Sequence, residues 1–232
     1  MISLNLPIEA VLPELLTAMQ HSADAILEAP PGAGKTTLVP LALLEQPWLG
    51  HQKILMLEPR RIAARSAAHR MASLLHEQVG ETIGYRMRLD TKVGKHTRVE
   101  VITDGILTRM LQEDPALSDV GLIIFDEFHE RSLDADLALA LCLKGREIFR
   151  EKDDPLRLLI MSATLNGEAL SAALCGAPVI RSEGKQFPVD IVYGVATQPR
   201  DPIVDKVVST TLKAIEENPD SNFLVFLPGQ GE

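Results

Sequence analysis

The chain has 232 residues, of which 46% are hydrophobic and 24% are charged. This composition supports a sizeable buried core and excludes a disordered chain, and no apolar run approaches the ~20 residues that cross a membrane. The net charge of −9 argues against a nucleic-acid partner at first sight. However, residues 51–98 carry ten Lys and Arg against four Asp and Glu. Such a basic window fits either a phosphate-contacting face or an ordinary solvated surface.

The cysteines and the N-terminus indicate the compartment. Cys142 and Cys175 lie far apart in the sequence, and neither has the Cys or His spacing of a zinc site. Residues 1–9 lack the basic start and apolar core of a signal peptide, because Pro7 and Glu9 interrupt them. We therefore expect a cytoplasmic protein with no membrane partner.

Short apolar runs alternate with helical stretches along most of the chain. Strands are predicted over Ala25–Glu28, Ile54–Leu57, Val99–Thr103, Gly121–Phe125 and Leu156–Met161. Helices are predicted over Thr36–Leu44, Ile62–Leu75, Gly105–Leu111, Leu133–Phe149 and Glu168–Leu174. The run Leu122–Phe125 is apolar without alternation, as in a central strand buried on both faces. The pattern predicts an α/β fold with a mostly parallel central sheet flanked by helices.

A domain boundary is predicted near Ala196–Pro202, where prolines and polar residues break regular structure. Beyond it we predict one helix, Val204–Glu217, and one strand, Phe223–Leu227. One helix and one strand cannot bury a core. We therefore expect residues 1–196 to form one domain and residues 197–232 to be a linker and the start of a second domain that continues elsewhere.

Residues 29–36, Ala-Pro-Pro-Gly-Ala-Gly-Lys-Thr, follow a predicted strand and open a predicted helix, which is the context of a phosphate-binding P-loop. Glycines let consecutive N–H groups converge on phosphate oxygens, and the helix adds its positive N-terminal end. The predicted nucleotide-binding residues are Gly32, Ala33, Gly34, Lys35, Thr36 and Thr37. The first position of the motif, usually Gly, is Ala29, which is acceptable if its backbone angles are ordinary.

Asp126 and Glu127 directly follow the buried strand. An acidic pair is costly there unless it faces a cleft at the carboxyl end of the strand, where open α/β sheets bind ligands. We expect Thr36 and Asp126 to hold Mg²⁺ and Glu127 to orient or deprotonate the attacking water, so the predicted chemistry is ATP hydrolysis. His129 lies two residues after Glu127. A lone histidine near a turn more often has a structural role than a catalytic one.

The motifs together resemble those of the DEAH-box ATP-dependent helicases. The resembling segments, in chain order, are residues 29–36, 58–64, 103–105, 126–129, 162–164 and 226–232, with Phe128 in the usual Ala place of the box. The sequence of residues 126–141, DEFHERSLDADLALAL, is most similar to that of the bacterial HrpB group. The resemblance spans nearly the whole chain and implies a RecA-like P-loop NTPase domain.

Further roles are implied by the resemblance alone. The catalytic set would be Lys35, Asp126, Glu127 and His129, with His129 coupling the nucleotide site to the second domain. Single-stranded nucleic acid, RNA more than DNA, would be contacted through its phosphates by Arg60, Arg61 and Thr103. Ser162 and Thr164 would link nucleotide hydrolysis to nucleic-acid binding. Arg70 would stack on the nucleotide base, or is a plain surface arginine.

The resemblance also implies limits and leaves an alternative. The family takes its arginine fingers from the second RecA-like domain, so we expect residues 1–232 alone to hydrolyse nucleotide slowly and not to unwind a duplex. Residues 4–20 show no adenine-reading arrangement, which implies that other NTPs are accepted besides ATP. A nucleotide-gated binding switch without processive work remains the alternative, whereas a P-loop kinase is disfavoured by the acidic box and the Ser-Ala-Thr motif.

Overall fold

The computed structural model describes residues 4–163, 167–184, 189–194, 196, 198 and 203–227. By its internal packing the chain divides into two units, Met1–Lys185 and Gln186–Glu232, which are described separately. None of the helices in the described ranges is long and apolar enough to cross a membrane.

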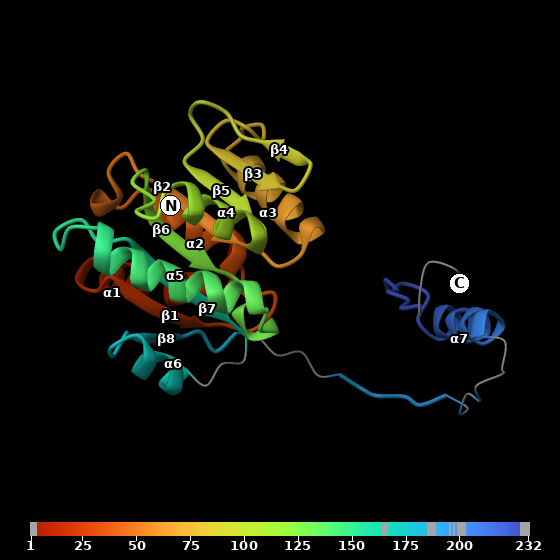
Figure 1. Ribbon diagram of the computed structural model, residues 1–232. Coiled ribbons are helices and arrows are strands. Elements are labelled where there is room, and N and C mark those ends of the chain that lie inside the picture. Colours follow the sequence, from red (N-terminus) through yellow and green to blue (C-terminus); the bar gives the residue numbers. More distant parts are fainter. Residues whose placement is uncertain are drawn as a thin grey trace. The chain divides into compact units, whose positions relative to one another are not determined.

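One sheet forms the centre of the first unit (Figure 1). The described strands are β1 (Asp24–Glu28), β2 (Lys53–Leu57), β3 (Ile83–Met87), β4 (Asp90–Lys92), β5 (Val99–Ile102), β6 (Val120–Phe125), β7 (Arg157–Ser162) and β8 (Val179–Arg181). Their order across the sheet is β4-β3-β5-β2-β6-β7-β1-β8. All neighbouring pairs are parallel except β3 and β4, which form an antiparallel hairpin. The mostly parallel sheet is therefore confirmed.

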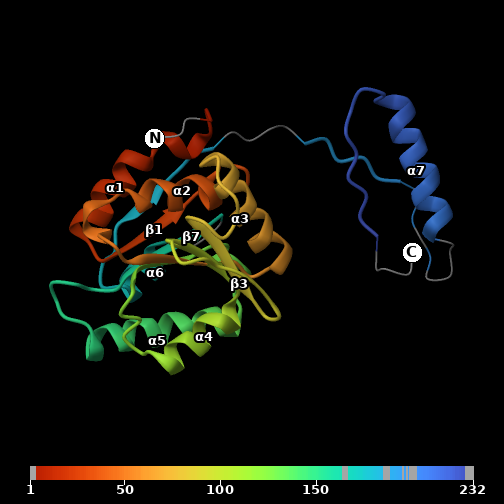
Figure 2. The same cartoon turned by 90° about the horizontal axis from the view of Figure 1, so that it is seen from above.

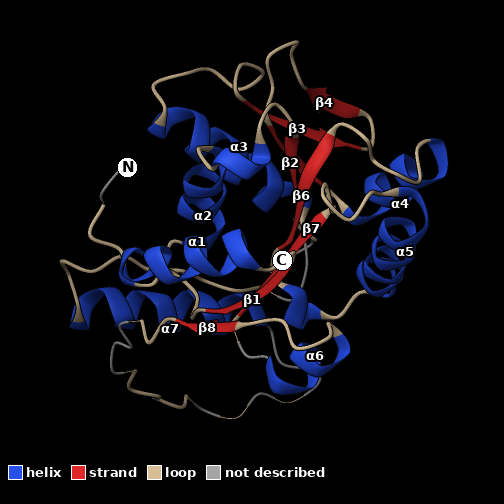
Figure 3. Cartoon of the chain, turned by 90° about the vertical axis from the view of Figure 1, so that its left-hand side faces the viewer, coloured by secondary structure: helices blue, strands red, loops and turns tan. Residues whose placement is uncertain are grey.

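Helices cover both faces of this sheet, as the edge-on view in Figure 3 shows. They are α1 (Leu12–His21), α2 (Lys35–Leu44), α3 (Arg61–Leu74), α4 (Asp104–Glu113), α5 (Leu133–Phe149) and α6 (Gly167–Ala173). The helices α1, α2 and α3 bury their apolar residues against one face, and α4, α5 and α6 bury theirs against the other (Figure 2). Every residue of β6 is buried, because this strand lies near the middle of the sheet and is covered on both sides.

Most of the predicted elements are present within a few residues of their expected bounds, and α5 spans the predicted residues. The sequence analysis missed α1, although Leu12, Leu15 and Met19 recur at helical spacing and are buried. It also missed β3, β4 and β8. The strands β4 and β8 have three residues each, which is too short for an alternating pattern to be recognised.

The second unit has one described helix, α7 (Ile203–Glu217), as predicted. The predicted strand Phe223–Leu227 was wrong: these residues belong to no helix or strand and have no ladder partner among the described residues. A strand needs a neighbour to satisfy its backbone groups. Within this unit α7 and Phe223 line an open groove of about 900 Å³, and no described residue of α7 is buried. The assignment of residues 197–232 to a linker and the start of a second RecA-like domain stays a prediction.

A charged contact joins the first strand to the fifth helix. The Arg146 guanidinium on α5 donates to both oxygens of Asp24 on β1, at 2.5 and 2.9 Å, and also to the carbonyl of Leu156 at 3.1 Å. The side chains of Asp24 and Arg146 are only 10% and 20% exposed. This bidentate pair fixes α5 relative to the edge of the sheet that carries β1.

We predict that Asp24→Asn lowers the free energy of unfolding by about 1–3 kcal/mol, because it leaves a mostly buried guanidinium without its charged partner. Chemical denaturation would measure the change. The matched control is Glu147→Gln, which removes an exposed partner of Lys144 on the same helix and should change the free energy of unfolding much less. Equal effects of the two substitutions would contradict this account.

Candidate active site

The P-loop lies at the carboxyl end of β1, between that strand and α2. Ala29 begins the loop, and its N–H donates to the Ser162 carbonyl at the end of β7 at 2.9 Å. Among the described residues, Ala29 is not one of those with positive φ, so alanine is accommodated there. Gly32 and Gly34 have φ values of +78° and +94°, which side chains rarely adopt. The backbone geometry predicted for a phosphate cradle is present.

The segment before α1 packs against this loop. The Ile8 N–H donates to the Ala33 carbonyl at 3.1 Å, and an ideal Cβ at Gly34 would lie only 2.7 Å from Leu6 Cδ1. The carboxylate of Glu9 shapes the segment by accepting the N–H groups of Leu4 and Leu6, each at 2.8 Å. Residues 4–9 therefore form a brace behind the loop, and the brace requires glycine at position 34.

Four predicted residues meet between the loop and the carboxyl end of β6. The Lys35 ammonium lies 2.8 Å from Glu127 Oε1, and the Thr36 hydroxyl donates to Asp126 Oδ2 at 2.6 Å. These pairs are 92 and 90 residues apart in the sequence. The Lys35 side chain is 4% exposed and Asp126 as a whole is 4% exposed, so both charges are held away from bulk water.

The electrostatics of Asp126 suit a metal ligand. Burial raises the pKa of its carboxyl to about 6, although the Thr36 hydrogen bond and the Lys35 charge act in the opposite direction. A divalent cation would provide the compensating charge that this buried carboxylate lacks. The Thr36 hydroxyl and the Asp126 carboxylate are oxygen donors of the type that Mg²⁺ prefers, with water and phosphate completing its shell. The described residues contain no group of three or more His, Cys, Asp and Glu side chains that could by themselves hold a metal ion.

His129 lies on the other side of Glu127, in a short 3-10 helix, Phe128–Glu130. Its Nδ1 is 3.4 Å from Glu127 Oε2 and accepts the Ala163 N–H at 3.4 Å. The imidazole therefore lies between Glu127 and the end of β7, where Ser162 is fully buried. Thr164, predicted to act with Ser162, lies outside the described residues. Glu127 itself has φ +49°, a left-handed conformation that is strained for this residue type.

Glu58, at the end of β2, is a buried carboxyl that the sequence analysis left without a role. It is 3% exposed. Burial, together with the negative charges of Asp126, Glu127 and Glu130, raises its pKa to about 8. Glu58 is therefore mostly protonated at neutral pH and adds little to the negative charge that faces Lys35. Its position directly after a buried strand, like that of Asp126, was the available signal.

The predicted nucleic-acid residues lie in different surroundings. Arg60 Nη2 is 2.7 Å from Glu130 Oε1, and Arg61 donates to the Arg88 carbonyl at 3.2 Å. Thr103 precedes α4 and lines a groove of about 700 Å³ between α4 and the β3–β4 hairpin. The cations on this groove are Arg86, Arg88 and Arg109, which the sequence analysis counted only by charge or not at all. Arg70 is exposed on α3, and no described contact joins it to the P-loop.

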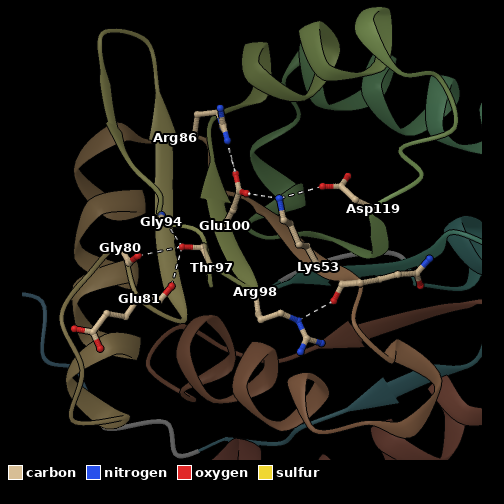
Figure 4. Close-up of polar contacts among 10 residues, drawn as sticks. Lys53, Gly80, Glu81, Arg86, Gly94, Thr97, Arg98, Glu100 and Asp119 are labelled. Atoms are coloured by element: carbon tan, nitrogen blue, oxygen red, sulfur yellow. Dashed lines mark hydrogen bonds and ion pairs between the residues drawn. The ribbon is translucent and has the colours of Figure 1, made fainter.

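A buried carboxylate holds one of the groove's cations (Figure 4). Glu100, on β5, is 1% exposed and accepts Arg86 Nε and Nη2 at 3.2 and 3.1 Å. On the other side of the carboxylate, Lys53 Nζ lies 3.3 Å from Glu100 Oε1 and 3.0 Å from Asp119 Oδ2. The Glu100 carboxylate is therefore paired with two cations. Arg86 is fixed on the β3 side of the groove, and its guanidinium has further N–H groups that do not bond Glu100.

Comparisons with known proteins agree with this arrangement. Residues 9–172 match the family model described as DEAD/DEAH box helicase. The chain is 51% identical over 228 residues to the ATP-dependent RNA helicase HrpB of Escherichia coli (strain K12), and 34% identical over 229 residues to the ATP-dependent RNA helicase HrpA of Borreliella burgdorferi. Both alignments cover 98% of this chain and 27% of the relative, so the chain spans about a quarter of their length. A crystal structure described as Escherichia coli DEAH/RHA helicase HrpB superposes with a TM-score of 0.88 at 52% identity, covering 98% of this chain and 28% of that one.

We predict that Gly34→Ala greatly weakens nucleotide binding and lowers stability by about 1–2 kcal/mol. The left-handed backbone is strained for alanine, and its methyl group would press on Leu6. Gly105→Ala is the matched control, because nothing lies within 4 Å of an ideal Cβ at that position on α4. Thermal denaturation and titration with a fluorescent nucleotide would measure both effects. Normal nucleotide affinity of Gly34→Ala would show that the brace is dispensable.

A second prediction concerns Glu58 and pH. Its pKa rises from an ordinary 4.5 to about 8 in the folded protein. Between these values the unfolded chain loses a proton that the folded protein keeps, so the free energy of unfolding falls as pH rises. Glu58→Gln removes this term, and the decline should become shallower by up to about 1.4 kcal/mol per pH unit.

Denaturant titrations between pH 5 and pH 9 would test this dependence, with substitution of the exposed Glu151 by Gln as the control. If the free energy of unfolding depends on pH in the same way for Glu58→Gln and the unsubstituted chain, the pKa of Glu58 is not raised and this explanation is wrong.

Proposed function

Because the chain belongs to the DEAD/DEAH box helicase family, we propose that it is the nucleotide-binding domain of a motor that moves along single-stranded nucleic acid by hydrolysing ATP. One observation carries the proposal: Lys35 and Thr36 of the P-loop lie directly against Glu127 and Asp126 of the acidic box. A phosphate cradle and a water-activating carboxylate at one site are the parts that NTP hydrolysis needs.

Each of the four residues has a role that follows from its position. The Lys35 ammonium, at the helix N-terminus, would bind the β- and γ-phosphates, and Thr36 and Asp126 would hold Mg²⁺, which neutralises phosphate charge when bound. A nucleotide that draws Lys35 away would release Glu127 from its 2.8 Å ion pair. The freed carboxylate would orient the attacking water and accept its proton, beside the His129 imidazole.

The groove between α4 and the β3–β4 hairpin supports a nucleic-acid track. Thr103 lines it together with Arg86, Arg88 and Arg109, and these are donors that bond phosphate oxygens without reading sequence. RNA is proposed over DNA because the two relatives compared above are named ATP-dependent RNA helicases. The remaining groups, including arginine fingers, would come from a second RecA-like domain, consistent with a chain that spans 27% of those relatives.

We predict that Glu127→Gln, in a protein carrying both motor domains, lowers RNA-stimulated ATP hydrolysis by at least ~100-fold, because an amide cannot take a proton from water. Nucleotide binding should be kept, because the amide oxygen of Gln still accepts a hydrogen bond from Lys35. The 232-residue chain alone should hydrolyse ATP slowly with or without RNA. GTP should be turned over at a rate similar to that of ATP.

A coupled-enzyme phosphate assay with and without single-stranded RNA measures these rates. If the chain alone is as fast as the two-domain protein, the second domain is dispensable. If RNA does not stimulate the two-domain protein, a nucleotide-gated switch is the better account.

A further inference from the structure

The turn that links the acidic box to α5 touches both segments proposed to bind nucleic acid. This turn, residues 127–132, begins with Glu127 of the nucleotide site. Near its end, Glu130 pairs with Arg60 at the start of α3, at 2.7 Å. Two residues later in the chain, the Ser132 hydroxyl donates to the Asp104 carboxylate at 2.6 Å, and Asp104 directly follows Thr103. The same six residues therefore contact the nucleotide site at one end and two nucleic-acid segments at the other.

The turn is built to have one defined geometry. The two residues that flank its 3-10 helix, Glu127 and Arg131, have φ values of +49° and +51°, which are strained for these residue types. Phe128 anchors it by packing edge-on against Phe125 with ring centroids 5.9 Å apart. Ser132 also caps α5 by accepting the Ala135 N–H at 2.9 Å. These contacts hold the turn at a defined place between the nucleotide site and the start of α5.

Two of these contacts differ in how easily they exchange. The Arg60 side chain is 71% exposed and that of Glu130 is 32% exposed, so the pair borders solvent and is weak. A nucleic-acid phosphate reaching Arg60 would compete directly with the Glu130 carboxylate, because one guanidinium edge serves either acceptor. The Lys35–Glu127 pair of the nucleotide site is of similar length but more buried, with the Lys35 side chain 4% and the Glu127 side chain 24% exposed.

We propose that Glu130 is a positioning residue that reports nucleic-acid binding to the nucleotide site. Resting on the proposed function, this inference adds a route for the coupling. Without nucleic acid, Glu130 holds Arg60 and keeps the turn in the observed geometry, with His129 against Glu127. A phosphate that takes Arg60 leaves Glu130 unpaired, and the turn then relaxes at the end that carries Glu127 and His129.

The experiment is a double-mutant cycle on oligonucleotide affinity. A fluorescein-labelled single-stranded oligo(U) is titrated with the chain and with Glu130→Gln, Arg60→Ala and the double variant, and anisotropy is recorded at fixed salt. Glu130→Gln should raise affinity about three- to ten-fold by freeing Arg60. In the Arg60→Ala background the same substitution should change nothing. Glu147→Gln removes one exposed negative charge far along α5 and controls for net charge.

A second titration tests the link to the nucleotide site. The affinity for a fluorescent ADP with Mg²⁺ is measured with and without saturating oligo(U), and the ratio is the coupling factor. Glu130→Gln should bring this factor at least halfway to one, whereas Glu147→Gln should leave it as in the unsubstituted chain.

The outcomes separate the two proposals. An equal gain from Glu130→Gln in the presence and absence of Arg60 would show a general charge effect and overturn the role of Glu130. An unchanged coupling factor would overturn it as well. In both cases the chain still binds oligo(U), so the proposed function stands. Failure of the unsubstituted chain to bind oligo(U) at low salt would remove the nucleic-acid part of the proposed function and this inference with it.

Discussion

The contact of Lys35 with Glu127 is the interaction on which the rest of the site depends. An ammonium that is 4% exposed needs a negative partner, and Glu127, just beyond the end of β6, provides one at 2.8 Å. The pair exists because β1 and β6 are parallel and end at the same edge, with only β7 between them. The Thr36–Asp126 hydrogen bond follows from the same geometry. The order of the strands thus sets the positions of the four side chains, and the charges of Lys35 and Glu127 stabilise one another.

This dependence explains which features could be predicted from the sequence. The P-loop and the acidic box carry their geometry locally: glycines at the positive-φ positions, a helix start, and acids directly after an apolar strand. Contacts between distant segments carry no such local signal. The pairing of Arg60 with Glu130 joins residues 70 positions apart, and that of Arg86 with Glu100 depends on the order of the strands. The hairpin β3–β4 was missed because β4 is only three residues long, and with it the groove beside Thr103.

The charge distribution resolves the conflict between an acidic chain and the anionic partner proposed for it. The net charge is −9, yet the groove beside α4 presents Arg86, Arg88 and Arg109. Acidic residues in and just after the basic window hold cations in place: Glu100 fixes Arg86, and Asp90 pairs with Arg65. Such pairing lowers the long-range attraction of the surface for nucleic acid and gives individual guanidinium groups defined positions. Local arrangement, more than net charge, therefore decides what this surface can bind.

The most direct test of the central claim is a calorimetric titration of the chain with ADP in the presence and absence of Mg²⁺. The account places Thr36 and Asp126 as ligands of the ion and Lys35 as a ligand of the phosphates, so binding should weaken at least ~10-fold when Mg²⁺ is withdrawn. Thr36→Val should remove most of that Mg²⁺ dependence. Binding of ADP with equal affinity in both conditions, or no binding at all, would contradict the account.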